Sequence, residues 1–102
     1  MKVKIINRIC FISIDREQHL NALNLNVLND LKDILLEYEQ SKEIRSLILT
    51  GAGKKAFIAG ADISEFANFT TDQGYDLSLN GHKKLCDFIE NLSKPVIAAI
   101  NG

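Results

Sequence analysis

The sequence predicts an α/β domain, and three of its patterns indicate that class. Two segments near the start alternate apolar and polar residues with the period of a β-strand. Two longer segments repeat apolar residues at helical spacing. Each of these is followed by a short continuous apolar run, which is typical of a buried strand. The 102 residues are enough for one modest domain, so residues 1–102 are treated as a single unit.

The first half of the chain is predicted to form a hairpin, a helix and a buried strand. The stretches KVKII and RICFISI alternate on either side of Asn7 and Arg8. Asn24 is a suitable N-cap for the helix that follows, which is expected to extend to about Ser41. The apolar residues of this helix recur on one side, at Val27, Leu28, Leu31, Ile34, Leu35 and Tyr38. The run SLILT at residues 46–50 then predicts a buried strand.

The segment after this strand is predicted to turn, to form a second strand and to enter a short helix. GAGKK at residues 51–55 predicts a turn, and AFIA at residues 56–59 predicts a short strand. Asp62 followed by Glu65 has the spacing of a helix capping pair. A brief helix, ISEFANF, is therefore expected over residues 63–69.

A long helix and a last buried strand complete the predicted order β-β-α-β-β-α-α-β. The helix starts near residues 70–73 and ends before Pro95, because proline disfavours a helical residue before it. VIAAI at residues 96–100 is a strand with no later segment to pair with. Its apolar faces and backbone groups would lack partners. We therefore expect this sequence to be the front part of a larger domain, or to be completed by other chains.

The charge balance excludes several classes of protein. The sequence has 12 basic and 13 acidic residues, whereas a dedicated nucleic-acid surface is expected to be basic. No apolar run approaches the roughly 18 residues that a membrane helix requires. The N-terminal segment lacks the apolar core of a signal peptide, so a cytoplasmic location is expected. Cys10 and Cys86 are expected to be buried reduced thiols, and neither has the spacing of a metal ligand.

Two nucleotide-binding patterns and two histidines are weak candidates for a site. GAGKKA at residues 51–56 matches the outline of a dinucleotide fingerprint, with Asp72 about 20 residues further on. These glycines run into a strand-like segment rather than a long helix, so a tight turn is the better interpretation. A P-loop would need glycine at Ile48. His19 is expected on the surface and His82 at a satisfied position on the inner side of a helix.

The strongest candidate site is FIAGAD, residues 57–62. Ala59, Gly60 and Ala61 are small, and small residues at a strand end allow a ligand or another backbone to approach closely. A helix start here would present free N–H groups, which suit a developing negative oxygen. A plain glycine turn explains the same residues. Asp62 and Glu65 could be paired catalytic carboxylates instead of a helix cap. The residues alone therefore leave open whether this segment is a site or a plain turn, and whether the two acids are catalytic or structural.

Four ordered stretches resemble the crotonase, or enoyl-CoA hydratase/isomerase, superfamily. FIAGADISEF resembles the family's AGAD(L/I) segment, and DREQHLNAL resembles its (D/N)RPxxxNAL loop. RSLILTGAGKKAF resembles VRALVLTGAGxxAF, and KPVIAAING resembles KPVIAAVNG. The matches run from about Ile5 to Gly102 in the family's order, which makes the resemblance specific. It implies a crotonase-like spiral of ββα units, of which this sequence would hold the N-terminal portion.

The resemblance implies an enzyme that binds acyl-CoA thioesters. Family members hold the thioester oxygen with two backbone N–H groups, and the first of these corresponds to Ala61. The implied CoA and substrate contacts lie in two segments, at Gln18, His19, Leu20 and Ala22 and at Ala59, Gly60, Ala61, Asp62, Ile63 and Ser64. Arg16 or nearby lysines could meet the CoA phosphates. Coenzyme A is carried by the substrate, so neither a separate cofactor nor a metal is expected.

Two departures from the family pattern limit the implied activity. The family's proline after Arg16 is Glu17 here, which puts an acid near the expected phosphates. The second oxyanion N–H and the two hydratase glutamates follow the position of Gly102 in the family, and none is present in this sequence. A full-length parent is expected to hydrate 2-enoyl-CoA to 3-hydroxyacyl-CoA. The 102-residue chain alone is expected to show little hydratase activity, because it lacks the acid–base pair.

Other functions share the same front half. Isomerases, thioester hydrolases, decarboxylases and dehalogenases of the superfamily contain these motifs, so the reaction and the acyl chain length stay open. A non-enzymatic alternative is an inactive truncated homologue that acts as a binding or assembly subunit. The resemblance also implies a homo-oligomer, because family members commonly form trimers and dimers of trimers.

Overall fold

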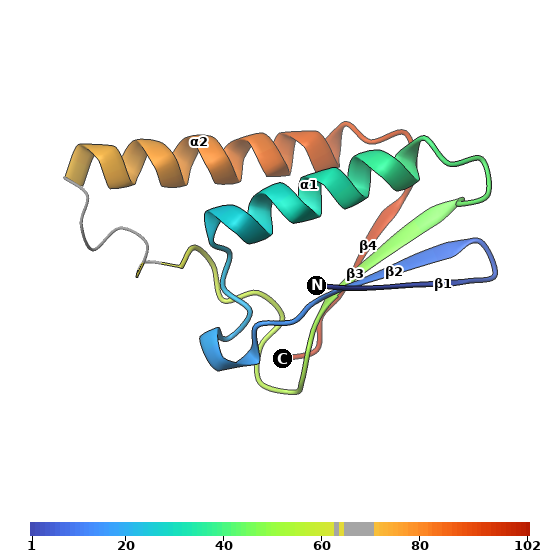
Figure 1. Cartoon of the computed structure of the whole chain (residues 1–102), viewed down its shortest axis with the longest axis horizontal. Helices are drawn as coiled ribbons and strands as arrows, with labels where there is room; N and C mark the ends of the chain where they lie inside the picture. Colours follow the sequence, from blue (N-terminus) through green and yellow to red (C-terminus); the bar gives the residue numbers. More distant parts are fainter. Residues whose placement is uncertain (63, 65–70) are drawn as a thin grey trace.

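A computed structural model describes residues 1–62, 64 and 71–102, and it confirms the predicted α/β class. A four-stranded sheet carries two helices on one face (Figure 1). A short 3-10 turn, Glu17–His19, separates the first hairpin from the first helix. In chain order the main elements are β1 (Lys2–Ile6), β2 (Ile9–Ile14), α1 (Leu25–Glu39), β3 (Ser46–Gly51), α2 (Thr71–Glu90) and β4 (Val96–Ala99).

The strands lie in the sheet in chain order, with β1 antiparallel to β2 and the other neighbours parallel. The hairpin turns at Asn7 and Arg8, whose φ angles of 52° and 69° match the turn to the twist of the strands. Because β2, β3 and β4 are parallel, their carboxyl ends lie at one edge of the sheet. The segments that follow these three strands therefore start close together (Figure 1).

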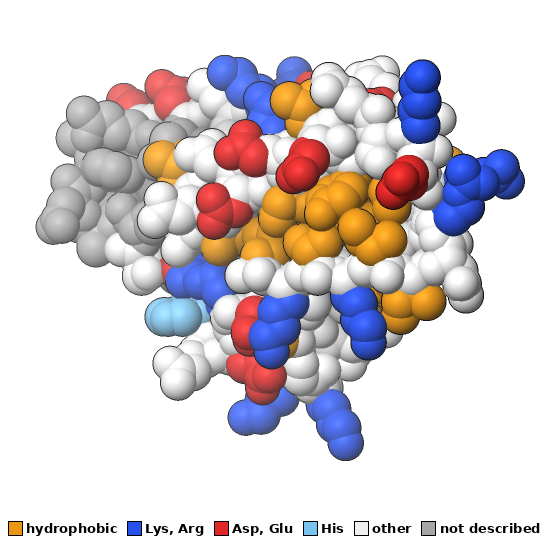
Figure 2. Space-filling view, turned by 45° about the vertical axis from the view of Figure 1, so that its right-hand side comes forward, with side chains coloured by type: hydrophobic (Ala, Val, Ile, Leu, Met, Phe, Trp, Pro, Cys, Tyr) orange, Lys and Arg blue, Asp and Glu red, His pale blue; other side chains and the backbone are white. Residues whose placement is uncertain are grey.

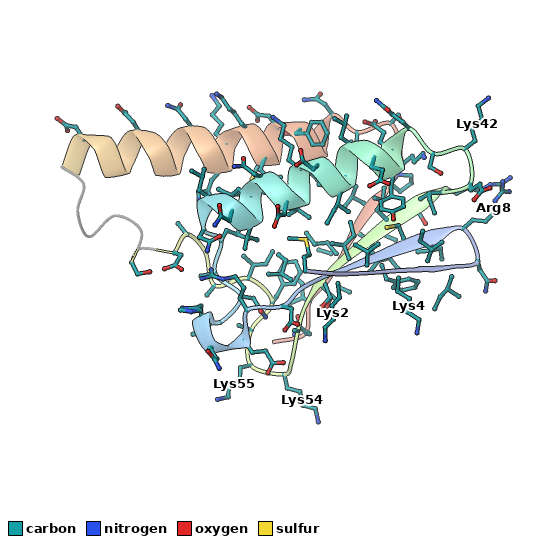
Figure 3. All side chains as sticks on the ribbon, in the orientation of Figure 1. Lys2, Lys4, Arg8, Lys42, Lys54 and Lys55 are labelled. Atoms are coloured by element: carbon teal, nitrogen blue, oxygen red, sulfur yellow. The ribbon has the colours of Figure 1, made fainter. Side chains whose placement is uncertain are left out.

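The core lies between the sheet and the two helices. Alternate residues of β2 and β3 face the helices and are buried, as strand geometry requires. The opposite positions point away from the helices, as Lys2 and Lys4 do in Figure 3. The buried cluster contains Cys10, Ile12, Ile14, Leu28, Leu31, Leu35, Leu47, Leu49 and Leu85.

Apolar surface remains exposed near both edges of the sheet. In the part of the chain that the structure describes, β4 pairs with β3 alone, and its Ile97 is 53% exposed. On β1, Val3 and Ile5 are 38% and 50% exposed. Figure 2 shows hydrophobic side chains gathered on the surface between acidic and basic ones. The expectation that the last strand exposes apolar side chains is therefore confirmed.

The helix predicted after Asn24 is confirmed as α1, and both of its ends are held by side chains. Asn24 Oδ1 accepts a hydrogen bond from the Val27 N–H at 2.8 Å, which is an N-cap. At the other end, Lys94 Nζ donates to the carbonyl oxygens of Tyr38, at 2.7 Å, and Ser41. A cation at this position satisfies the last carbonyls and interacts favourably with the helix dipole. The segment that leads into β4 is thereby fixed to the end of α1.

The short strand predicted at residues 56–59 is wrong. The backbone groups of this segment bond to a loop rather than to a neighbouring strand. The Ala59 N–H donates to the Leu20 carbonyl, and the Ala56 carbonyl accepts from side-chain amides. The two large apolar residues of the segment still pack against the core. The apolar pattern of residues 56–59 therefore reflects the packing of Phe57 and Ile58 against the core and not the pairing of a strand.

The long helix predicted from residues 70–73 is confirmed as α2, which ends at Glu90, ahead of Pro95. The brief helix predicted over residues 63–69 lies outside the described residues, apart from Ser64. α2 contacts α1 along the layer above the sheet (Figure 1).

The predicted thiol burial holds for one cysteine and is wrong for the other. Cys10 is buried, and this burial raises the pKa of its thiol. Cys86 is exposed on α2. It directly follows the buried Leu85, and one helical residue turns the side chain by about 100°, out of the core. His19 is exposed as predicted, and His82 is half-buried on α2.

We expect Lys94→Met to lower the free energy of unfolding by about 1 kcal/mol, because it removes the cation from the last carbonyls of α1. Urea denaturation followed by circular dichroism measures this change. Lys42→Met, at an exposed position in the loop after α1 (Figure 3), is the matched control and should alter the value by less than about 0.5 kcal/mol. Equal effects of the two substitutions would contradict the proposed cap.

Candidate functional site

Three connecting segments meet beyond the carboxyl ends of the parallel strands. They are residues 15–24 after β2, residues 52–62 after β3 and residues 100–102 after β4. In open α/β sheets, ligands commonly bind in the crevice outside the carboxyl ends of the strands. The site residues predicted from the sequence lie on the first two of these segments, except Ile63 and Ser64, which follow the second.

Asn21 joins the first two segments. It is 1% exposed, and its Nδ2 donates to the carbonyl oxygens of Ala52 and Ala56 at 3.0 and 2.9 Å. Its Oδ1 accepts from the Arg16 N–H at 2.9 Å. A buried amide without partners would be costly, so these bonds fix the loop and the turn against each other.

Asn101 holds the same turn from the end of β4. Its Oδ1 accepts from the Gly51 N–H at 3.1 Å, and its Nδ2 donates to the carbonyl oxygens of Gly53 and Ala56 at 2.8 and 3.2 Å. Gly51 is required, because a Cβ there would lie 2.2 Å from the Phe57 carbonyl oxygen. The predicted tight turn is confirmed. No helix begins within residues 51–62, all of which are described, so the dinucleotide fingerprint lacks its structural context.

The AGAD segment runs beside the end of the first loop. The Leu23 N–H donates to the Gly60 carbonyl at 2.8 Å, and the Asp62 N–H donates to the Leu23 carbonyl at 2.9 Å. These two bonds form an isolated parallel bridge between Leu23 and Ala61. A third bond, from the Ala59 N–H to the Leu20 carbonyl at 3.2 Å, continues the contact.

The Gly60–Ala61 peptide directs one N–H group outward. The Gly60 carbonyl is bonded to Leu23, and a trans peptide points the next N–H to the opposite side. Among the described residues, none accepts a hydrogen bond from the Ala61 N–H. Gly60 has a φ of 122°, which favours glycine, and among the described residues beyond its two neighbours no atom lies within 4 Å of the place of a Cβ. Within the part of the chain that the structure describes, the Ala61 N–H is therefore a free donor next to open space.

The predicted contact residues lie along the two paired segments. They differ in how far they are exposed to solvent. The exposed ones are Gln18, His19, Leu20, Ala59 and Ser64, the half-buried ones are Gly60 and Ala61, and the buried ones are Ala22 and Asp62. Ile63 lies outside the described residues. The structure thus brings the two predicted segments together, and their contact with CoA stays a prediction.

Leu20 takes an uncommon conformation at this edge of the molecule. Its φ of 53° is left-handed, which is rare for leucine, and the residue is 47% exposed. It borders a hollow of about 220 Å³ between the loop and the turn, lined also by Glu17, Gln18, Asn21, Ala52, Lys55 and Ala56. Figure 3 shows Lys54 and Lys55 extending from the turn. Backbone strain of this kind concentrates at functional sites.

Arg16 and Asp62 form an ion pair across the two segments. Arg16 Nη2 lies 2.9 Å from Asp62 Oδ2, and the two side chains are 18% and 10% exposed. The Asp62 carboxylate also accepts from the Ser64 N–H and hydroxyl, at 3.1 and 2.6 Å. The Ser64 hydroxyl bond and the Arg16 bond hold the pKa of Asp62 at about 2.

These contacts modify two expectations for the charged residues. The Asp62 carboxylate accepts from the Ser64 N–H and hydroxyl, whereas Glu65, its predicted capping partner, lies outside the described residues. Contact between Arg16 and the CoA phosphates stays a prediction, but the side chain already has partners within the chain. Its guanidinium is bound to Asp62 and, through Nη1, to the Ala22 carbonyl.

Sequence reasoning missed the structural roles of Asn21 and Asn101. Both lie in the matched motifs NAL and ING, and this was the only signal. Their main acceptors are far away in the sequence, since the Ala56 carbonyl is 35 positions from Asn21 and 45 from Asn101. Spacing along the chain does not reveal such pairs.

The described part of the chain offers neither a membrane span nor a metal site. Neither of its helices is both long and apolar enough to cross a bilayer. No group of three His, Cys, Asp or Glu side chains among the described residues could hold a metal ion.

The chain has an α/β fold, and a backbone N–H without an acceptor among the described residues lies beyond the carboxyl ends of its strands. A protein of this class can bind an oxygen atom of a ligand through its main chain. A profile of the enoyl-CoA hydratase/isomerase family matches residues 4–102. The chain belongs to this family.

Curated relatives and solved structures agree with this assignment. A short-chain-enoyl-CoA hydratase from Clostridium acetobutylicum is 42% identical over 95 residues, covering 93% of this chain and 36% of the relative. A crotonyl-CoA hydratase from Syntrophomonas wolfei is 36% identical over 95 residues, with the same two coverages. The crystal structure of an enoyl-CoA hydratase from Bacillus anthracis, 38% identical, superposes with a TM-score of 0.92 and covers 99% of this chain and 39% of that one. The chain thus spans about a third of the length of the curated relatives it matches.

We expect the carboxyl group of Asp62 to titrate near pH 2 in the folded chain, below its ordinary value of 3.8. The lowered pKa favours the ionised form on folding, so its stabilising effect is present above pH 3.8 and is lost as the pH falls through about 2. Carboxyl carbon NMR measures the midpoint. Ser64→Ala and Arg16→Met should both raise it, Ser64→Ala by more.

Lys2→Met is the control for this titration. It removes the exposed Lys2–Asp15 ion pair, whose atoms are 3.5 Å apart, and should leave the Asp62 midpoint unchanged. An Asp62 midpoint at its ordinary value in the wild-type chain would contradict the bonds described above.

Proposed function

We propose that this chain binds the thioester end of an acyl-CoA and polarises its carbonyl through the Ala61 N–H. The observation that carries the proposal is the orientation of the Gly60–Ala61 peptide, which presents a free N–H beside open space. Family membership supports the choice of ligand, since the relatives' names refer to enoyl-CoA and crotonyl-CoA hydratases.

A backbone donor suits the chemistry of a thioester. Abstraction of a proton from the carbon next to the carbonyl, or addition of water at C3 of an enoyl thioester, places negative charge on the carbonyl oxygen. A preorganised N–H aimed at that oxygen stabilises the transition state by about 3 kcal/mol. The donor belongs to the main chain, so the side chain of Ala61 need not be reactive. Ala61 is therefore proposed as the first oxyanion donor.

The CoA portion is proposed to follow the exposed loop. Gln18, His19 and Leu20 are exposed on the loop that pairs with the Ala61 segment, and Ala59 and Ser64 are exposed on that segment. Lys55 lines the hollow beside this loop. With Arg16 engaged by Asp62, lysines of the 51–56 turn are the better candidates for the CoA phosphates.

Hydration of 2-enoyl-CoA is the reaction proposed for a full-length parent. In the family pattern, a second N–H and two glutamates complete the site, and they correspond to no residue in this sequence. Isomerisation or another crotonase reaction remains the alternative, because the residues present serve any chemistry that builds charge on the thioester oxygen. A cytoplasmic location stays a prediction.

Assembly with other chains is a second proposal with its own observation. β4 forms an edge of the sheet without charged residues, and Ile97 is 53% exposed there. An exposed edge strand readily pairs with another chain. Sedimentation analysis of the 102-residue chain tests this reading, and a stable monomer at high concentration would contradict it.

The binding proposal predicts that crotonyl-CoA binds more tightly than free CoA to the 102-residue chain. Calorimetric titration measures both affinities. Replacing Ala61 by lactic acid, which turns the amide into an ester, should weaken crotonyl-CoA binding about threefold to tenfold, because one hydrogen bond is lost. Free CoA affinity should be unchanged. The same ester exchange at Lys42, an exposed position in the loop after α1, is the control, and equal losses at the two positions would argue against the Ala61 donor.

The catalytic proposal predicts little hydration of crotonyl-CoA by the 102-residue chain, because the acid–base pair is absent. The loss of absorbance of the enoyl thioester measures the rate. Rapid hydration by this chain would overturn the assignment of the glutamates to residues outside this sequence.

A further inference from the structure

Among the described residues, two hydrogen bonds hold the peptides on either side of Ala61 and so set the direction of its N–H. The Leu23 N–H donates to the Gly60 carbonyl, and the Leu23 carbonyl accepts from the Asp62 N–H. These bonds form an isolated bridge that is not part of a longer β-ladder. A short bridge at the surface opens readily unless neighbouring groups hold it. The groups that hold this bridge therefore decide how well the donor is aimed.

Arg16 spans the bridge with a single planar group. Its Nη1 donates to the carbonyl of Ala22, the residue before Leu23. Its Nη2 donates to the carboxylate of Asp62, the residue after Ala61. The nitrogens of a guanidinium have a fixed separation, so the two segments are held at a fixed distance. We infer that Arg16 is a positioning residue for the Ala61 N–H, a role that rests on the proposed function for its chemistry.

Arg16 is itself held in place. Its N–H donates to Asn21 Oδ1, and its carbonyl accepts from the N–H groups of Asn21 and His19, all at 2.9 Å. Asn21 is in turn anchored to the 51–56 turn. The backbone of Arg16 is therefore held in place, and its side chain, which is only 18% exposed, connects the two segments.

Arg16 also offsets a charge that would oppose the reaction. The Asp62 carboxylate directly follows the donor residue, and a negative group near a developing oxyanion is unfavourable. The guanidinium lies 2.9 Å from that carboxylate and balances it. Arginine at this position therefore both aims the N–H and keeps the neighbouring acid from acting against it.

Amide hydrogen exchange tests the positioning role without any ligand. In Arg16→Met, the amides of Leu23 and Asp62 should exchange about tenfold faster relative to the amide of Leu47 in β3. Arg16→Lys keeps the charge but lacks the planar pair of donors, so it should give an intermediate increase. Lys42→Met, at an exposed position in the loop after α1, should change neither ratio.

Two results would overturn the inference. In the first, Leu23 and Asp62 keep their exchange rates relative to Leu47. In the second, all three amides accelerate equally, which indicates a loss of overall stability. If Arg16→Met does not fold, Arg16→Lys gives the same decision: faster relative exchange supports the role, and unchanged exchange contradicts it.

A pair of ligands separates this inference from the proposed function. Crotonyl-CoA carries the carbonyl oxygen, whereas S-butyl-CoA is a thioether of the same length without it. The wild-type chain should prefer the thioester about threefold to tenfold, the value of one hydrogen bond. Arg16→Met should remove this preference and leave thioether affinity within about twofold of wild type. No preference in the wild-type chain contradicts the proposed function, while a preference retained in Arg16→Met contradicts the positioning role.

Discussion

The hydrogen bonds between Leu23 and the peptides on either side of Ala61 are the interaction on which the site depends. They join a loop that follows β2 to a loop that follows β3, and they fix which side of the chain each peptide group faces. With the Gly60 carbonyl turned toward Leu23, the Ala61 N–H can only point away. The rest of the fold serves to bring these two loops together.

The sheet and its polar anchors provide that meeting point. Parallel pairing places the carboxyl ends of β2, β3 and β4 at one edge, where their following segments converge. The carbonyls of the 51–56 turn then need partners, and the side-chain amides of Asn21 and Asn101 supply them. Both amides donate to the Ala56 carbonyl, so one turn is held by two other segments. The short glycine-rich turn gains a fixed position in this way.

The negative charge of Asp62, next to the Ala61 donor, is balanced by neighbouring groups. The Asp62 carboxylate is bound by the Ser64 hydroxyl and by Arg16, and its pKa is held at about 2. It therefore stays ionised and paired across the physiological range. The chain thus joins a backbone donor, an exposed loop and a balanced ion pair at the edge of an ordinary α/β sheet. None of these parts requires a reactive side chain.

The sequence by itself determined the α/β class, the helices α1 and α2, the central strands and the family, because hydrophobic period and local motifs depend on near neighbours. It also pointed to FIAGAD, through small residues and ordered motifs. It misread residues 56–59 as a strand and Cys86 as buried. Only the tertiary structure decided the free N–H of Ala61, the Arg16–Asp62 pair and the asparagine anchors. Their partners lie 31 to 50 residues apart in the sequence, and no local spacing encodes a contact that exists only when distant loops are packed together.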